Sequence, residues 1–235
     1  MKYFNQEIEN ELIYQGAELI RFVDISHLSE TQNRQFPNAV VFALPLTAGY
    51  IKEVCDTPNY VQARIDDNYN FDDDEYLITE NKTHELADHI ATYITEKGYK
   101  AFSQSDQNLI VEGKFDESHK QSLLPNKTIA LLGGLGWIGK NNLLITSEYG
   151  AAQCLGTVLT DAPLETVLCE RLYPKCGKCI ACVNICERRV LTGKTWNSYT
   201  SRDEIIDVYG CSTCLKCLVH CPYTQRYCKR QTKLR

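Results

Sequence analysis

The sequence predicts an α+β protein, with an α/β domain over residues 1–168 and a small cysteine-rich module over residues 169–235. Two observations support this fold class. Helical and strand-like patterns alternate as far as residue 165, which is typical of a sheet with helices packed on it. Eight of the twelve cysteines then fall between Cys176 and Cys221. A chain of 235 residues can hold one domain of ordinary size together with such a module.

The first half of the chain has the clearest periodic patterns. Apolar residues that recur every three or four positions before a glycine, as they do before Gly16 and Gly98, indicate helices. The run NAVVFALP is apolar throughout, which predicts a strand buried on both faces. In chain order the patterns predict a helix over 3–15, strands over 17–23 and 38–45, a helix over 47–63 interrupted by Pro58, a helix over 79–97, and strands over 99–103 and 109–112.

The second half has shorter elements. A helix over 128–132 ends at the glycines of GGLGWIGKNN, and strands over 143–146 and 154–160 complete the α/β domain. Within the cysteine-rich module, residues 202–208 predict a helix between two cysteine runs.

The two cysteine runs read CGKCIACVNIC and CSTCLKCLVHC, with 24 residues between them. Both follow the spacing C-x2-C-x2-C-x3-C of bacterial ferredoxins that hold two 4Fe–4S clusters. In that arrangement the fourth cysteine of each run ligates the cluster of the other run. The predicted ligand sets are therefore Cys176, Cys179, Cys182 and Cys221 for the first cluster, and Cys211, Cys214, Cys217 and Cys186 for the second.

Two other interpretations of the cysteines are weaker. A zinc site needs two C-x2-C pairs and leaves the third and fourth cysteine of each run unexplained. Disulfides require an oxidising compartment, and the tight loops would crowd any pairing. One departure from the ferredoxin pattern is Glu187, which stands where a proline often follows the first run, whereas Pro222 follows the second.

Charge and composition limit the classes of partner and location. The N-terminal residues lack an apolar signal region and no run is long enough to span a membrane, so the sequence predicts a cytoplasmic protein that does not bind membranes. A net charge of −5 disfavours general nucleic-acid binding. Residues 223–235 nevertheless hold five basic residues and no acidic one, and this tail is either solvated or in contact with a phosphate or an acidic partner.

The glycine-rich segment at residues 133–142 has several interpretations. Gly134, Gly136 and Gly139 match the dinucleotide fingerprint G-x-G-x-x-G, but the following residues read as a strand rather than a helix. The same segment fits G-x4-G-K, although Asn141 stands where a P-loop needs serine or threonine. A tight packing loop is a third interpretation.

The order of the motifs GLGWIGKNNLLIT, GTVLTDAPL and the two cysteine runs resembles the epoxyqueuosine reductase family, over roughly residues 119–223. Members of that family are cobalamin-dependent iron–sulfur enzymes related to reductive dehalogenases. The resemblance implies a nitroreductase-like α/β sandwich that holds base-off cobalamin, followed by a ferredoxin-like module. It also implies two 4Fe–4S clusters that relay electrons from an external low-potential donor of the ferredoxin or flavodoxin type.

The resemblance also implies roles for individual residues. Asp161 takes the position of the family's proton donor, which protonates the leaving oxygen. An acid near the reacting carbon is needed because the carbon–oxygen bond breaks only if its oxygen is protonated. The residues that would line the corrin are Gly136, Trp137, Ile138, Gly139, Lys140 and Asn141.

One departure affects the expected substrate. Longer family members carry a C-terminal helical-repeat domain that grips tRNA, whereas this sequence ends 13 residues after Pro222, as a short form would. The expected activity is therefore reductive removal of an epoxide oxygen in queuosine tRNA modification, or a related reduction of a smaller substrate or a corrinoid. The alternatives are a ferredoxin-type electron carrier that reduces a separate corrinoid or flavin protein, and a flavin enzyme with two clusters.

Overall fold

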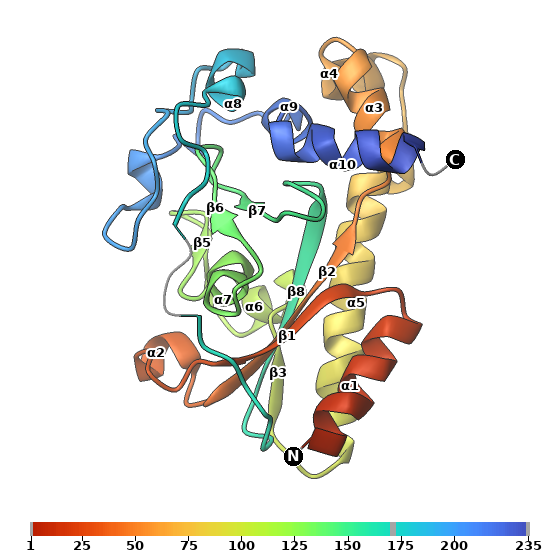
Figure 1. Ribbon diagram of the computed structural model, residues 1–235. Helices are drawn as coiled ribbons and strands as arrows, with labels where there is room; N and C mark the ends of the chain where they lie inside the picture. Colours follow the sequence, from red (N-terminus) through yellow and green to blue (C-terminus); the bar gives the residue numbers. More distant parts are fainter. Residues whose placement is uncertain (1, 170–172, 234–235) are drawn as a thin grey trace. The chain divides into compact units, whose positions relative to one another are not determined.

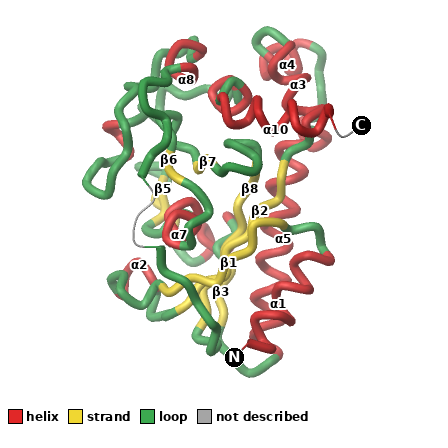
Figure 2. Tube along the Cα trace, viewed as in Figure 1, coloured by secondary structure: helices red, strands yellow, loops and turns green. Residues whose placement is uncertain are grey.

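The computed structural model describes residues 2–169 and 173–233, and it has an α+β fold (Figures 1 and 2). The chain forms two compact units that are interleaved along the sequence. The first unit comprises Met1–Leu44, Thr79–Leu135 and Cys154–Arg171, and the second comprises Pro45–Ile78, Gly136–Gln153 and Leu172–Arg235. Across the described ranges, every helix is too short or too polar to cross a membrane.

A four-stranded sheet organises the first unit, with the strand order β1-β2-β8-β3. Strand β2 pairs antiparallel with β1, and β3 pairs antiparallel with β8. A short β4–β5 hairpin lies outside this sheet. The elements are α1 (Lys2–Tyr14), β1 (Glu18–Asp24), α2 (Glu30–Asn33), β2 (Asn38–Pro45), most of α5 (Glu75–Glu96), β3 (Ala101–Ser103), α6 (Asp106–Val111), β4 (Phe115–Asp116), β5 (Gln121–Ser122), α7 (Asn126–Leu132) and nearly all of β8 (Gln153–Thr160).

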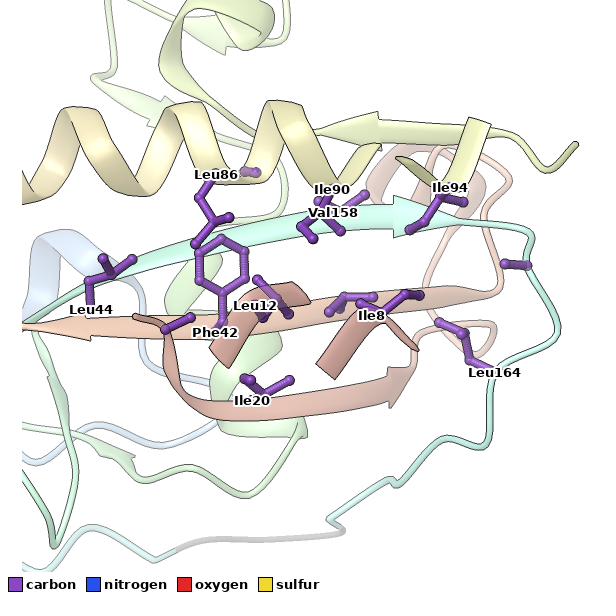
Figure 3. Close-up of a cluster of buried hydrophobic side chains, with 14 residues drawn as sticks. Ile8, Leu12, Ile20, Phe42, Leu44, Leu86, Ile90, Ile94, Val158 and Leu164 are labelled. Carbon is purple, nitrogen blue, oxygen red and sulfur yellow. The ribbon is translucent and has the colours of Figure 1, made fainter. Parts of the chain in front are cut away.

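Helices α1 and α5 supply the core that covers one face of this sheet (Figure 3). Leu86, Ile90 and Ile94 recur along α5 at helical spacing and contact side chains of β2 and β8. Phe42 stands at the centre of the cluster and touches the backbone of β8, where a Cβ on Gly156 would lie 2.3 Å from its ring. Strand β2 is buried from Ala39 to Leu44, so the predicted strand with two buried faces is confirmed.

The second unit contains more helix than strand, and it contains both cysteine runs. Helix α3 packs against α9 and α10, and α8 packs against α9. The glycine-rich segment forms a short hairpin in which Trp137 pairs with Ile145 and Ile138 with Leu144. The elements are α3 (Ala48–Asp56), α4 (Tyr60–Asp66), the 3-10 turn η1 (Phe71–Asp73), β6 (Trp137–Ile138), β7 (Leu144–Ile145), α8 (Ala181–Ile185), the 3-10 turn η2 (Arg202–Glu204), α9 (Lys216–Val219) and α10 (Pro222–Lys233).

Two predicted elements were wrong. Residues 109–112, predicted as a strand, lie mainly in helix α6, because Ser105 and Asp106 begin a helix that ends before Gly113. The helix predicted over 202–208 is only the 3-10 turn η2. Its continuation is extended, because Ile206 forms a β-bridge with Leu191.

The sequence predicted a single domain boundary after residue 168, whereas the two compact units are each made of three segments of the chain. Residues 45–78 and 136–153 group with the cysteine-rich segment rather than with the sheet. The hairpin and α3 both contact residues of the cysteine runs, which explains this grouping.

Candidate metal centre

Four cysteines line one cavity of about 280 Å³ in the second unit. Two of them lie in the turn before α8, one lies in α8, and one lies between α9 and α10. They are Cys176, Cys179, Cys182 and Cys221. The fourth comes from the other cysteine run, and these four are the set that the spacing predicts for the first cluster.

The other four cysteines also gather, around Cys217. Burial, followed by interactions with neighbouring thiols, raises the pKa of the Cys217 thiol to about 12. Those neighbours are Cys214, Cys182, Cys211 and Cys186. The group thus contains the whole set predicted for the second cluster, together with one member of the first.

Each group contains at least one thiol with a raised pKa. Burial, followed by the proximity of Cys176 and Cys221, raises the pKa of Cys182 to about 11. Binding of iron must therefore displace protons from these thiols. Within residues 2–169 and 173–233, no three histidine, cysteine or carboxylate side chains converge on a point where a single metal ion would bind. A 4Fe–4S cluster does not need such a point, because each thiolate binds a different iron atom.

Three basic side chains share the cavity with the four cysteines. Lys140, Lys175 and Arg226 line it, and none of the described residues around it is a carboxylate. Lys140 is only 8% exposed, and a buried ammonium is costly unless negative charge lies beside it. The cavity therefore suits a negatively charged group that is ligated by thiolates. A 4Fe–4S cluster with its four thiolate ligands is such a group.

The hairpin that carries Lys140 is bonded to both cysteine runs. The Nζ of Lys140 donates a hydrogen bond to the Gly177 carbonyl in the first run, at 3.0 Å. The Nδ2 of Asn141 donates to the Cys217 carbonyl in the second run, at 3.2 Å. Both side chains are buried, so these bonds are shielded from water. Two adjacent residues thus hold the two predicted ligand turns against the same hairpin.

The glycines of this hairpin are required by its own packing. A Cβ on Gly136 would lie 2.1 Å from the Ile145 carbonyl oxygen, and one on Gly139 would lie 2.8 Å from the Ile145 side chain. Ile138 between them is buried. The side of each glycine on which a Cβ would stand therefore faces β7, as the packing-loop interpretation of the sequence expects.

Trp137 lies in the hairpin and carries an N–H donor that makes no hydrogen bond with the described residues. Its side chain is buried, and its Nε1 has no hydrogen-bond partner among the described residues. The ring packs edge-on against Tyr223, with 4.7 Å between centroids, and the Lys175 ammonium lies 5.4 Å from the ring centre. A buried indole N–H without a partner is uncommon, and it could donate to a bound group.

Asp161 belongs to the first unit, where it directly follows β8. It is exposed, and its Oδ1 accepts a hydrogen bond of 2.7 Å from the Lys100 backbone N–H. The carboxylate thus fastens the end of the β3–β8 pair. Its assignment as proton donor stays a prediction.

Sequence reasoning assigned Lys140 to the corrin and missed the other two basic side chains around the cavity, Lys175 and Arg226. Lys175 directly precedes Cys176, and Arg226 lies little more than one helical turn after Cys221. Their closeness to the cysteines in the sequence was an available signal. The role of Lys140 could not be read in the same way, because the first run lies far along the chain from it.

Comparison with known proteins places the chain beside the epoxyqueuosine reductases, which confirms the resemblance. It is 35% identical over 119 residues to the epoxyqueuosine reductase of Listeria monocytogenes, covering 43% of this chain and 30% of that protein. It is 28% identical over 189 residues to the Aliivibrio fischeri epoxyqueuosine reductase, covering 73% of this chain and 45% of that protein. No protein-family model matches the chain.

Solved structures share the fold. An epoxyqueuosine reductase crystallised with an epoxyqueuosine-modified tRNA-Tyr stem loop matches 95% of this chain and 66% of its own, with a TM-score of 0.60 and 14% identity. A reductive dehalogenase described as B12-dependent matches 97% of this chain and 33% of its own, with a TM-score of 0.65 and 15% identity. The chain spans about a third of the length of the first curated relatives, which are matched over 30%, 32% and 35% of their sequences.

Proposed function

We propose that this chain is an iron–sulfur oxidoreductase of the epoxyqueuosine reductase type, in which two 4Fe–4S clusters supply electrons to a cobalamin. The observation that carries this proposal is the cavity in which four cysteines from two runs meet three basic side chains. Similarity to curated epoxyqueuosine reductases supports the reaction class.

The cysteines would hold the clusters in two crossed sets. Cys176, Cys179 and Cys182 would bind the first cluster together with Cys221. Cys211, Cys214 and Cys217 would bind the second together with Cys186. Each set takes one thiolate from the other run, so the two clusters would be neighbours. Neighbouring clusters suit a relay that passes one electron at a time.

The hairpin would hold the cobalamin. Cobalamin, when bound, would supply the strongly reducing cobalt centre that the reaction needs. The buried N–H of Trp137 fits a hydrogen bond to such a group, because it has no partner among the described residues. Contact of the corrin with Gly136 and Gly139 rests on the resemblance alone, because Ile145 already covers their faces. A shared fold with a B12-dependent dehalogenase supports the cofactor.

Asp161 would supply the proton that the leaving oxygen needs. Its carboxylate is fixed in orientation by the Lys100 N–H, at 2.7 Å, and is open to solvent for reprotonation. The variant Asp161→Asn keeps an oxygen that can accept this hydrogen bond but cannot donate an acidic proton. It should retain clusters and cobalamin and lose turnover, whereas normal turnover would remove Asp161 from this role.

The substrate class follows from the relatives. Epoxyqueuosine within tRNA is the first candidate, because a structure with the same fold was solved with a modified tRNA stem loop. A smaller epoxide or a corrinoid is the second candidate. Turnover of epoxyqueuosine in a tRNA stem loop and in the free nucleoside separates these candidates.

Anaerobic reconstitution with iron and sulfide, followed by titration with cobalamin, tests the proposal. Two clusters correspond to about eight iron atoms per chain. Tight cobalamin binding with a base-off cobalt(II) spectrum is the expected result. Fewer than about eight irons, or retention of flavin with no corrinoid binding, would contradict it.

A ferredoxin-type carrier is the second candidate function. It is favoured by the close packing of Gly136 and Gly139 on Ile145, which accounts for these glycines without a macrocycle. A carrier would load both clusters, bind no cobalamin, and reduce a separate corrinoid or flavin protein. The same titration therefore distinguishes the carrier from the enzyme.

A further inference from the structure

Helix α10 carries a positively charged face in a chain whose net charge is −5. Arg226, Lys229 and Lys233 follow one another at spacings of three and four residues, which places them on one side of the helix. All three are exposed, and α10 contains no acidic residue. We call Arg226, Lys229, Lys233 and the neighbouring Lys175 the basic face.

The basic face begins at the cluster cavity. Arg226 and Lys175 both line that cavity, and Cys179, which lines it too, is exposed. A cluster held by these cysteines would therefore reach solvent next to the basic face. Such a position allows electrons to enter from a protein that touches this surface.

The opposite side of α10 fixes the helix in place. The Tyr227 hydroxyl donates to the Leu46 carbonyl at 2.9 Å, and the Thr224 hydroxyl accepts from the Ala151 N–H at 2.9 Å. Arg230 is also engaged, because it donates to the carbonyls of Ser147 and Glu148. These bonds leave the basic face on a helix that is held at several points.

We propose that the basic face docks an acidic electron-donor protein and that electrons enter the chain through the first cluster. This inference rests on the proposed function, because it needs loaded clusters. In each transfer the donor loses one electron and the first cluster gains one, so no bond forms and no proton moves. Opposite charges on the two proteins would accelerate their encounter and orient it.

A phosphodiester backbone carries the same sign of charge as an acidic protein. The exposed cysteine at the start of the basic face favours the redox partner, because an RNA contact there would make no use of a cluster edge at the surface. RNA binding is therefore treated as an outcome of the test.

The test measures how fast the anaerobic, cluster-loaded chain is reduced by an acidic flavodoxin in its hydroquinone form. The variant is the double charge reversal Lys229→Glu with Lys233→Glu, at two positions outside the cavity. The matched control is Lys82→Glu with Lys114→Glu, which makes the same charge change at exposed sites in the first unit. Photoreduction by deazaflavin measures how fast and how fully the clusters are reduced when no protein donor is involved.

The α10 reversal should slow reduction by flavodoxin at low salt by at least about tenfold and flatten its dependence on ionic strength, while the control stays near the unaltered rate. Photoreduction should be equal in all three proteins. Equal flavodoxin rates in the two variants would overturn the inference alone. So would loss of tRNA binding in the α10 reversal with unchanged flavodoxin rates, which would assign the face to RNA. Failure to load clusters in the unaltered chain would overturn the proposed function, and this inference with it.

Discussion

Replacing Lys140 with methionine removes the buried charge beside the first predicted cluster. Methionine has a similar length and can fill the same space, so the hairpin should stay folded. The chain loses the hydrogen bond to the Gly177 carbonyl and one of the three basic side chains that line the cavity. Since the added electron is negative, loss of a nearby positive charge disfavours the reduced cluster. The reduction potential should therefore fall.

The size of the shift follows from Coulomb's law. At an effective dielectric of about 20, a unit charge roughly 8 Å from the added electron contributes about 2 kcal/mol. For a one-electron couple this corresponds to roughly 90 mV, and partial screening by solvent reduces it to somewhere between about 50 and about 90 mV. The second cluster, whose cysteines do not line this cavity, should shift by less.

The assay is a redox titration of the reconstituted protein, followed by electron paramagnetic resonance under anaerobic conditions. Lys178→Met is the matched control, because Lys178 directly follows Gly177 in the same turn but is exposed. Its removal should change the first potential only slightly, since water screens its charge. A Lys140→Met shift no larger than that of Lys178→Met would refute the reasoning.

Four further predictions concern stability and cluster assembly. Gly136→Ala should lower the free energy of unfolding by about 1–3 kcal/mol, because the new Cβ meets the Ile145 carbonyl. Gly49→Ala inside α3 should raise it by about 0.5–1 kcal/mol, because glycine in a helix is less stable than alanine. Chemical denaturation measures both changes. Asp74→Ala should lower the free energy of unfolding by about 2–5 kcal/mol, because it leaves the buried hydroxyls of Tyr50 and Tyr60, each 2.8 Å from the carboxylate, without their partner. Asp73→Ala, at an exposed position, is the control, and similar melting temperatures of the two variants would contradict this account. Cys221→Ser should lose the first cluster and Cys186→Ser the second, each leaving about four irons, and the opposite pairing in their resonance spectra would exclude the crossed ligand sets. Iron retention against a chelator should improve as the pH rises from about 7 to about 9, because the raised pKa values of Cys182 and Cys217 make protons compete with iron, and retention that is independent of pH would argue against protonated thiols in the iron-free chain.

The elements that the sequence predicted well are those with a strong local signal. Strand β2 was expected from an uninterrupted apolar run and has the expected bounds. Helix α5 was expected from its repeating apolar positions, although it begins four residues earlier than the predicted 79–97. Helix α10 was not predicted, because its residues are mostly polar and only Thr224 and Tyr227 are buried. Pro222 at its first position was a usable sign of a helix start.

In the candidate site, too, local features could be predicted from the sequence and contacts between distant segments could not. Cysteine spacing within each run is local, so the four cysteines that share the cavity could be grouped in advance. The contacts of Lys140 and Asn141 depend on how the hairpin packs on distant turns, and no periodicity records that. The glycines were an ambiguous signal, because close approach to a cofactor and close approach to a neighbouring strand require the same residue.

The hairpin has a consequence for how the chain matures during synthesis. Residues 137–145 leave the ribosome before either cysteine run, and their pairing spans few residues, so they can fold while the rest is still being made. The first run then meets Lys140, and the second meets Asn141. Both turns would be in place on this template before iron is inserted, so the two cysteine groups would already be assembled to receive it.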